Sequence, residues 1–129
     1  MPKRVLIVDD EEKNLRLVRD ILAANGYLTS EATNGKEAVE IALNHPPDLI
    51  LMDIQMPILD GLSAIKILKT NDSVKHIPIV ALTAKSMALD QEGVMCAGAD
   101  GYLRKPISIK NLLKSVKKHA EHLDISSDA

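Results

Sequence analysis

Three short apolar runs limit the possible folds more than any other feature of this chain. They lie at 5–8, 49–52 and 77–82, and most of their residues are large and aliphatic. Because the runs do not alternate with polar residues, they are typical of strands buried on both faces of a sheet. Two more polar segments, 28–33 and 101–104, complete a predicted set of five strands, and their polarity favours the edges of the sheet.

Segments with helical periodicity separate these runs. The first ends near Asn25, and the second begins at Asn34, an N-cap with Glu37 three residues further on. Asp60 and Ser108 are the expected N-caps of two later helices. The predicted apolar faces consist of Leu15, Val18, Ile21 and Leu22; of Ala38, Ile41 and Ala42; of Leu62, Ile65 and Leu68; and of Ile109, Leu112, Leu113 and Val116.

Strict alternation of strands and helices determines the expected fold class. Residues 85–97 are expected to form a further helix by elimination, which completes the alternation. Such chains form right-handed crossovers and a parallel sheet. We therefore predict an α/β fold of the flavodoxin-like, doubly wound type, a five-stranded sheet in the order 2-1-3-4-5 with helices on both faces. The 129 residues allow one domain, which we assign to 1–123, with a C-terminal tail at 124–129.

Composition excludes several classes of function. The net charge of −2 provides no electrostatic footprint for nucleic acid, and two Tyr without Trp or Phe provide no platform for stacking bases. No apolar run approaches the roughly 18 residues that a membrane span requires. A single cysteine, Cys96, is compatible with a reducing compartment. We expect a cytoplasmic monomer with no nucleic-acid partner and no membrane insertion.

Polar residues follow the predicted strands at one rim of the sheet. Asp9 and Asp10 end the first strand, Asp53 the third, Thr83 the fourth, and Lys105 follows the fifth. In doubly wound sheets, ligands bind beyond the carboxyl ends of the strands. Clustered carboxylates repel one another unless a cation lies between them, and a few carboxylates with water and phosphoryl oxygens are typical of Mg²⁺. The three aspartates, one Mg²⁺ and Lys105 together are formally neutral.

Four motifs resemble those of a known family. They are VLIVDD at 5–10, DLILMDIQMP at 48–57 followed by Asp60 and Gly61, ALTA at 81–84, and GYLRKP at 101–106. Because the four motifs occur in this order and at these strand ends, the chain resembles the response-regulator receiver domain, the CheY-like phosphoacceptor of two-component systems. The resemblance covers essentially the whole chain. Its extent, with Met1 at the start, is similar to that of stand-alone single-domain receivers, and we expect a complete regulator of that kind.

The resemblance implies a role for each residue of the rim. Asp53 would be the phosphoacceptor, which takes a phosphoryl group from a phosphohistidine of a histidine kinase or histidine phosphotransfer protein. Asp9, Asp10, Asp53 and the backbone carbonyl of Gln55 would bind Mg²⁺, for which Mn²⁺ or Ca²⁺ could substitute. Lys105 would contact the phosphoryl oxygens.

The resemblance also implies a conformational switch. The hydroxyl of Thr83 would donate to the phosphoryl group, and Tyr102 would move from an exposed to a buried position. The surface formed by residues 85–97, strand 101–104 and the helix that begins near Ile109 would then bind a downstream protein. The expected protein is a signalling phosphoacceptor and not an enzyme, since it catalyses only its own phosphorylation and slow dephosphorylation.

Three alternative functions share features of this sequence. A phosphatase of the haloacid-dehalogenase type needs a second aspartate two residues after the nucleophile, where this chain has Gln55. A flavodoxin-like FMN carrier would need a phosphate-binding loop where Asp9 and Asp10 would repel the phosphate. A receiver-like module that binds partners without phosphorylation remains the alternative, although the acidic pair, Asp53 and Lys105 are all present.

Overall fold

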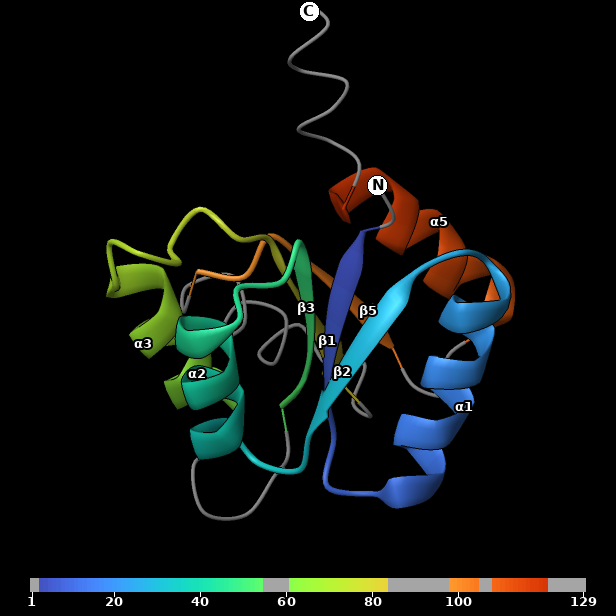
Figure 1. The fold of residues 1–129 in the computed structure, drawn as a ribbon, viewed down its shortest axis with the longest axis horizontal. Helices are drawn as coiled ribbons and strands as arrows, with labels where there is room; N and C mark the ends of the chain where they lie inside the picture. The colour runs from blue at the N-terminus through green and yellow to red at the C-terminus, as the bar shows by residue number, and fades with distance from the viewer. Residues whose placement is uncertain (1–2, 55–60, 84–97, 105–107, 121–129) are drawn as a thin grey trace, which may run out of the picture.

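Five parallel strands form one sheet in the order β2-β1-β3-β4-β5, which confirms the predicted fold class. The computed structural model describes residues 3–54, 61–83, 98–104 and 108–120 (Figure 1). The strands are β1 (Arg4–Val8), β2 (Leu28–Ala32), β3 (Leu49–Asp53), β4 (Ile79–Thr83) and β5 (Gly101–Arg104). The two more polar segments are the edge strands, as predicted.

Helices cover both faces of this sheet (Figure 1). α1 (Glu12–Ala24) and α5 (Ile109–Ala120) pack on one face, and α2 (Gly35–Asn44) and α3 (Gly61–Thr70) on the other. The helix expected at 85–97 and the tail at 124–129 lie outside the described residues. Within the described residues, no helix is long and apolar enough to cross a bilayer.

The three apolar runs are buried because both faces of their strands are covered. In β1, Leu6 and Val8 face the core beneath α2 and α3, whereas Val5 and Ile7 face the core beneath α1 and α5. All residues of β3 and β4 are buried. Successive side chains of a strand point to opposite faces, so a strand covered on both sides must be apolar throughout.

The predicted apolar faces of the helices are largely confirmed. Leu15, Val18 and Leu22 of α1 are buried, and Ile65 and Leu68 of α3 are equally enclosed. The side chain of Leu62 is outside those described. On α5, Leu112 and Val116 are buried, but Ile109 is 57% exposed, so its assignment to the apolar face was wrong. Ile109 is the first residue of α5, at the end of the helix, whereas Leu112 and Val116 lie one and two turns further on.

Two predicted N-caps are confirmed by their hydrogen bonds. The backbone N–H of Glu37 donates to Asn34 Oδ1 at 2.9 Å, and that of Asn111 donates to Ser108 Oγ at 3.0 Å. Glu37 Oε1 in turn accepts from the backbone N–H of Thr33 at 2.8 Å and from its hydroxyl at 2.9 Å. These bonds, the backbone one first, lower the pKa of Glu37. The stabilisation that these hydrogen bonds give the folded protein is therefore complete at pH values above the ordinary pKa of Glu37. It is lost as the pH falls through the lowered pKa of Glu37 in the folded state. The expected N-cap Asp60 lies outside the described residues.

β4 begins two residues later than the sequence predicts. Ile77 and Pro78 precede the strand, which starts at Ile79. The backbone N–H of Ile77 donates to the carbonyl of Val74, so Ile77 closes a turn while its side chain fills the core. Pro78 has no N–H, although its carbonyl accepts from Ile50 of β3 at 3.0 Å. Hydrophobicity alone does not distinguish these buried positions from the strand.

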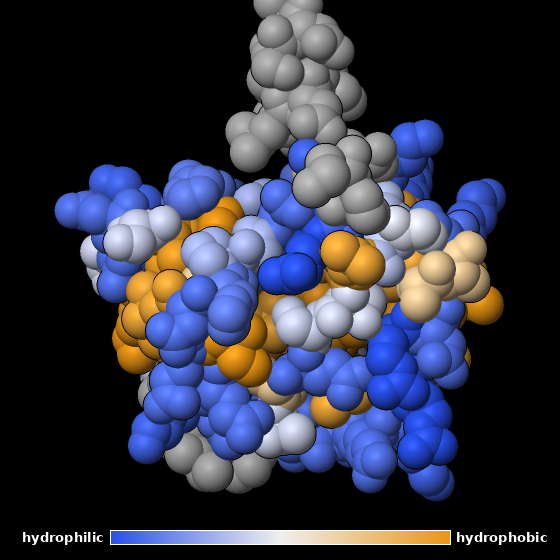
Figure 2. Space-filling view, viewed as in Figure 1, coloured by the Kyte–Doolittle hydropathy of each residue, from blue (hydrophilic) through white to orange (hydrophobic). Residues whose placement is uncertain are grey.

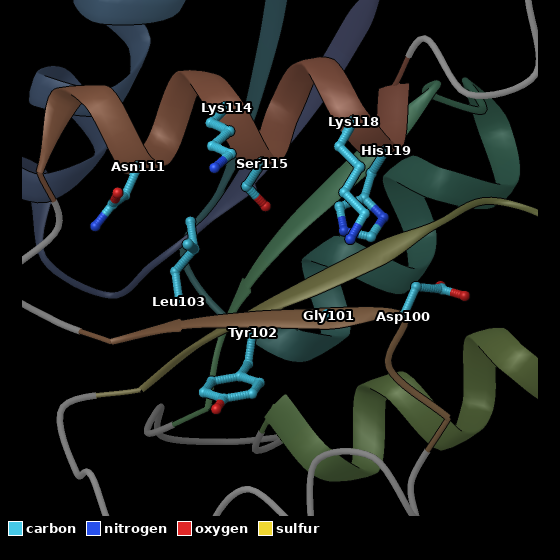
Figure 3. A pocket seen from close by; sticks show the side chains of 9 residues that line it. All are labelled: Asp100, Gly101, Tyr102, Leu103, Asn111, Lys114, Ser115, Lys118 and His119. Carbon is cyan, nitrogen blue, oxygen red and sulfur yellow. The ribbon is translucent and has the colours of Figure 1, made fainter. Parts of the chain in front are cut away.

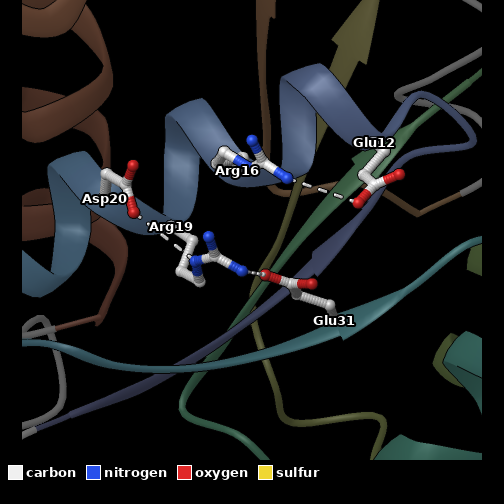
Figure 4. Close-up of polar contacts among 5 residues, drawn as sticks. All are labelled: Glu12, Arg16, Arg19, Asp20 and Glu31. Atoms are coloured by element: carbon white, nitrogen blue, oxygen red, sulfur yellow. Dashed lines mark hydrogen bonds and ion pairs between the residues drawn. The ribbon is translucent and has the colours of Figure 1, made fainter.

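Charged side chains connect α1 with β2 (Figure 4). Arg19 Nη1 lies 3.2 Å from Glu31 Oε2, and Arg16 lies 3.5 Å from Glu12 within the helix. Viewed as in Figure 1, the surface is mostly hydrophilic, with hydrophobic residues between the hydrophilic ones (Figure 2). Partly exposed ion pairs of this kind contribute little to stability.

Lys69, near the end of α3, joins three segments of the chain. Its ammonium lies 2.7 Å from Asp100 Oδ2 and donates to the carbonyl of Ile77 at 2.9 Å. Asp100 Oδ2 also accepts from the backbone N–H of Ile79 at 2.8 Å. Gly98 has φ +112°, and a Cβ there would lie 3.0 Å from Lys69 Cγ. Lys69 therefore ties α3 to the start of β4 and to the segment that enters β5.

Replacing Lys69 with Met should destabilise the protein by about 2 kcal/mol, because it removes the ammonium that pairs with Asp100 and the donor to Ile77. The aliphatic stem is retained, so the loss reports on the polar contacts. Urea unfolding monitored by circular dichroism measures it. Lys75→Met is the matched control, since the Lys75 ion pair with Asp72 is exposed and should contribute less than about 0.5 kcal/mol. Equal losses in both variants would contradict the role assigned to Lys69.

Candidate functional site

The carboxyl ends of β1 and β3 bring three aspartates together. Val8 pairs with Met52 in the parallel register, so Asp9 and Asp53 follow neighbouring positions of adjacent strands. Carboxylate oxygens of Asp9, Asp10 and Asp53 all lie within 4.8 Å of one another. The sequence predicted this cluster from strand ends alone, and the register of the sheet is the physical cause of it.

Burial differs among the three carboxylates. Asp9 is 2% exposed and Asp53 is 4% exposed, whereas Asp10 is open to solvent. Asp9 Oδ1 accepts from the backbone N–H of Glu11 at 2.9 Å, which holds the side chain in a turn between β1 and α1. Glu11 is not among the site residues predicted from the sequence. Its position two residues after Asp9 is the sequence signal for such a turn.

Thr83 lies at the same rim as the aspartates. Asp53 pairs with Leu82 in the register of β3 and β4, and Thr83 is the next residue of β4. The backbone N–H of Ile54 donates to the carbonyl of Leu82 at 3.0 Å, so the pairing of the two strands continues past Asp53. Thr83 is 4% exposed and is therefore a buried hydroxyl next to the acidic cluster.

Tyr102 lies on the edge strand β5, two strands away from Asp53. It pairs with Ala81 of β4 and is 38% exposed. Leu103, the next residue, packs on the core beneath α1 and α5, so Tyr102 points to the opposite face. Tyr102 is therefore not part of the acidic cluster, and its role as a switch stays a prediction.

Two predicted site residues lie outside the described residues. Gln55 follows Asp53 by two positions, and Lys105 follows Arg104, which pairs with Thr83 at the end of β5. Their roles remain predictions.

The three carboxylates fit a divalent cation of the Mg²⁺ type. Hard cations take oxygen ligands, and the cluster offers oxygen donors from three side chains. Two of these carboxylates are almost fully buried, which is unfavourable for neighbouring negative charges without a compensating cation. The chemistry of the donor set therefore favours metal binding at this end of β1 and β3.

Comparison with known proteins identifies the family. The family model of the response regulator receiver domain matches residues 5–117. The chain belongs to this family, the phosphoacceptor receivers of two-component signalling. This agrees with the fold and with the acidic cluster at the ends of β1 and β3.

Similar proteins cover almost the whole chain. The polar-differentiation response regulator DivK of Brucella anthropi is 45% identical over 119 residues, which are 92% of this chain and 97% of DivK. The chemotaxis protein CheY4 of Vibrio cholerae has a TM-score of 0.88 at 29% identity over 92% of this chain and 99% of its own. The receiver domain of the sensor histidine kinase PA1611 of Pseudomonas aeruginosa has a TM-score of 0.87 at 31% identity over 93% of this chain and 98% of its own, and it was solved with a magnesium ion coordinated in its active-site cleft.

Proposed function

We propose that this chain accepts a phosphoryl group on Asp53 in a Mg²⁺-dependent transfer from a partner phosphohistidine. The observation that supports the proposal most strongly is the cluster of three carboxylates within 4.8 Å at the ends of β1 and β3. A carboxylate oxygen of Asp53 attacks phosphorus, and the bond from phosphorus to the histidine nitrogen breaks. The released imidazole takes a proton from solvent, and the product is an acyl phosphate on Asp53.

Each neighbour of Asp53 has a distinct role in this proposal. Asp9, Asp10 and Asp53, with the backbone carbonyl of Gln55, would hold the cation, which when bound neutralises charge on the phosphoryl group. Mn²⁺ or Ca²⁺ could take the same donors. Lys105 would pair with phosphoryl oxygens as a point charge. Asp9 is held in place by the N–H of Glu11, so its carboxylate is oriented before the substrate arrives.

The conformational change that follows phosphorylation would begin at Thr83, which lies at the same rim as Asp53. Phosphorylation adds negative charge and acceptor oxygens to Asp53, and the hydroxyl of Thr83 can donate to them. Tyr102 on β5 would then move inward and change the surface formed by 85–97, β5 and α5, where a downstream protein binds. The conformational change is a population shift biased by the phosphoryl group.

The proposal assigns the partners and the setting of the protein. A histidine kinase or a histidine phosphotransfer protein supplies the phosphoryl group, and the downstream partner is a protein, with no nucleic acid involved. The receiver domain would comprise 1–123 with a tail at 124–129, and it would act as a cytoplasmic monomer. Catalysis would be limited to its own phosphorylation and slow dephosphorylation.

Treatment with acetyl phosphate and Mg²⁺ tests the acceptor. We expect the intact mass to increase by one phosphoryl group, which is acid-stable and base-labile as an acyl phosphate should be. Asp53→Asn should show no increase, because an amide is not a nucleophile toward phosphorus here. Omitting Mg²⁺ should also suppress the reaction. An unchanged mass for the wild type, or modification that persists in Asp53→Asn, would instead favour a module that binds partners without phosphorylation.

A further inference from the structure

A groove runs between the edge strand β5 and helix α5 (Figure 3). Its volume is about 430 Å³. The residues of α5 that line it recur at helical spacing and point toward the strand (Figure 3). The lining includes Gly101 and Leu103 of β5 and Asn111, Lys114, Ser115 and Lys118 of α5. The groove is separate from the acidic cluster at the ends of β1 and β3.

The groove carries positive charge. Lys114 and Lys118 are exposed, and among the described residues neither ammonium forms an ion pair. The one acidic residue of the lining, Asp100, is already bound to Lys69 at 2.7 Å and accepts a backbone N–H of β4. The negative charge of Asp100 is therefore compensated by Lys69, and the two lysines set the charge that a ligand would meet.

The floor of the groove is an edge strand. In the part of the chain that the structure describes, β5 pairs with β4 alone. Main-chain N–H and C=O groups of β5 that face away from β4 are therefore unpaired with any other described strand, and they can pair with an added one. Gly101 presents no side chain, and His119 Nε2 lies 2.9 Å from the place that a Cβ would take. The missing side chain allows α5 to approach the strand closely at this end.

The spacing of the lysines matches that of an extended peptide. Residues four apart on a helix lie about 6 Å apart, and alternate residues of a strand lie about 6.6 Å apart. Lys114 and Lys118 can therefore contact two side chains at alternate positions of one strand. The residues between those two would face the side of Tyr102, which is 38% exposed and presents an aromatic surface.

We propose that this groove binds an extended segment of a partner protein, with Asp or Glu at alternate positions and apolar or β-branched residues between them, as an added strand on β5. Main-chain hydrogen bonds to β5 would provide affinity, and Lys114 and Lys118 would select the acidic residues. The proposal concerns the surface that the proposed function assigns to the downstream partner, and it specifies the chemistry of that partner. It does not require the phosphoryl group for recognition.

A labelled synthetic peptide in which Glu alternates with Val or Thr is the probe, and fluorescence anisotropy measures its binding. We expect the double variant Lys114→Gln and Lys118→Gln to bind about tenfold more weakly, since two charge pairs are lost. Lys110→Gln with Lys117→Gln is the matched control, because these lysines of the same helix do not line the groove. The control should keep its affinity within about twofold.

Two further measurements test the strand geometry. A peptide of the same composition with its Glu residues contiguous should bind at least about fivefold more weakly, because only one lysine can then be reached. Amide hydrogen exchange at Gly101–Arg104 should slow when the alternating peptide is bound. Equal binding of both peptides, equal losses in both lysine pairs, or slowed exchange confined to other strands would overturn the proposal.

The substitution Asp53→Asn separates this proposal from the phosphoacceptor role. It should abolish phosphoryl uptake and leave peptide affinity within about twofold, since the peptide contacts β5 and α5 and not the acidic cluster. A failure of phosphorylation would therefore leave the peptide result standing. Loss of peptide binding in Asp53→Asn with a folded spectrum would overturn recognition independent of the phosphoryl group.

Discussion

Mg²⁺ at a hundred times its Kd should raise the free energy of unfolding by about 2.7 kcal/mol, because only the folded chain brings Asp9, Asp10 and Asp53 together. For a domain of this length the melting temperature should increase by about 10 °C. Thermal unfolding followed by circular dichroism over a series of MgCl₂ concentrations measures this increase. NaCl at matched ionic strength controls for general screening of charge.

Asp53→Asn identifies the source of that increase. Without Mg²⁺ the variant should be at least as stable as the wild type, since one negative charge is removed from a cluster only 4.8 Å across. With Mg²⁺ the increase should fall to less than about half. Asp72→Asn is the matched control, since Asp72 is an exposed residue remote from the cluster, and it should retain the full increase. The assignment fails if both variants respond to Mg²⁺ as the wild type does.

Leu51→Ala should lower the free energy of unfolding by about 4 kcal/mol, the largest effect that we expect from a single substitution. Leu51 lies in the central strand β3, is 0% exposed, and packs in the core beneath α1 and α5. Truncation of the Leu51 side chain leaves a cavity between the sheet and the helices α1 and α5, which the surrounding packed side chains cannot fill. Urea unfolding at constant slope measures the loss.

Leu28→Ala is the control for that experiment. Leu28 begins the edge strand β2 and is 48% exposed, so its truncation should cost less than about 1 kcal/mol. A loss at Leu28 as large as that at Leu51 would contradict the division of the sheet into a buried centre and exposed edges. The comparison uses the same residue type in strands of the same sheet.

Much of the fold could be predicted because local pattern and tertiary burial agree. The apolar run at 5–8 indicated a strand covered on both faces, and β1 has that environment. The predicted strand bounds and helix faces were wrong where a buried residue lies outside a strand or where an apolar residue of a helix is exposed. Ile77 is buried without belonging to β4, and Ile109 is apolar but 57% exposed at the start of α5. The pattern of apolar residues shows which side chains are hydrophobic. It does not show where a strand begins or where the contact of a helix with the core ends.

The sequence by itself determined which chemical groups stand at the ends of the strands. Asp9 and Asp10 follow β1, and Asp53 and Thr83 are the last residues of β3 and β4, so the chain order already places carboxylates and a hydroxyl at one rim. The register of the sheet then brought oxygens of the three carboxylates within 4.8 Å of one another, and the surrounding fold buried two of these residues.

Only the tertiary structure could show how residues from separate elements meet. Lys69 and Asp100 lie in segments remote in sequence, and neither was singled out before the fold joined them at 2.7 Å. Lys114 and Lys118 of α5 likewise line one groove with Gly101 and Leu103 of β5 only because α5 packs beside that strand. Such contacts depend on the angle and distance between packed elements, which local sequence patterns do not encode.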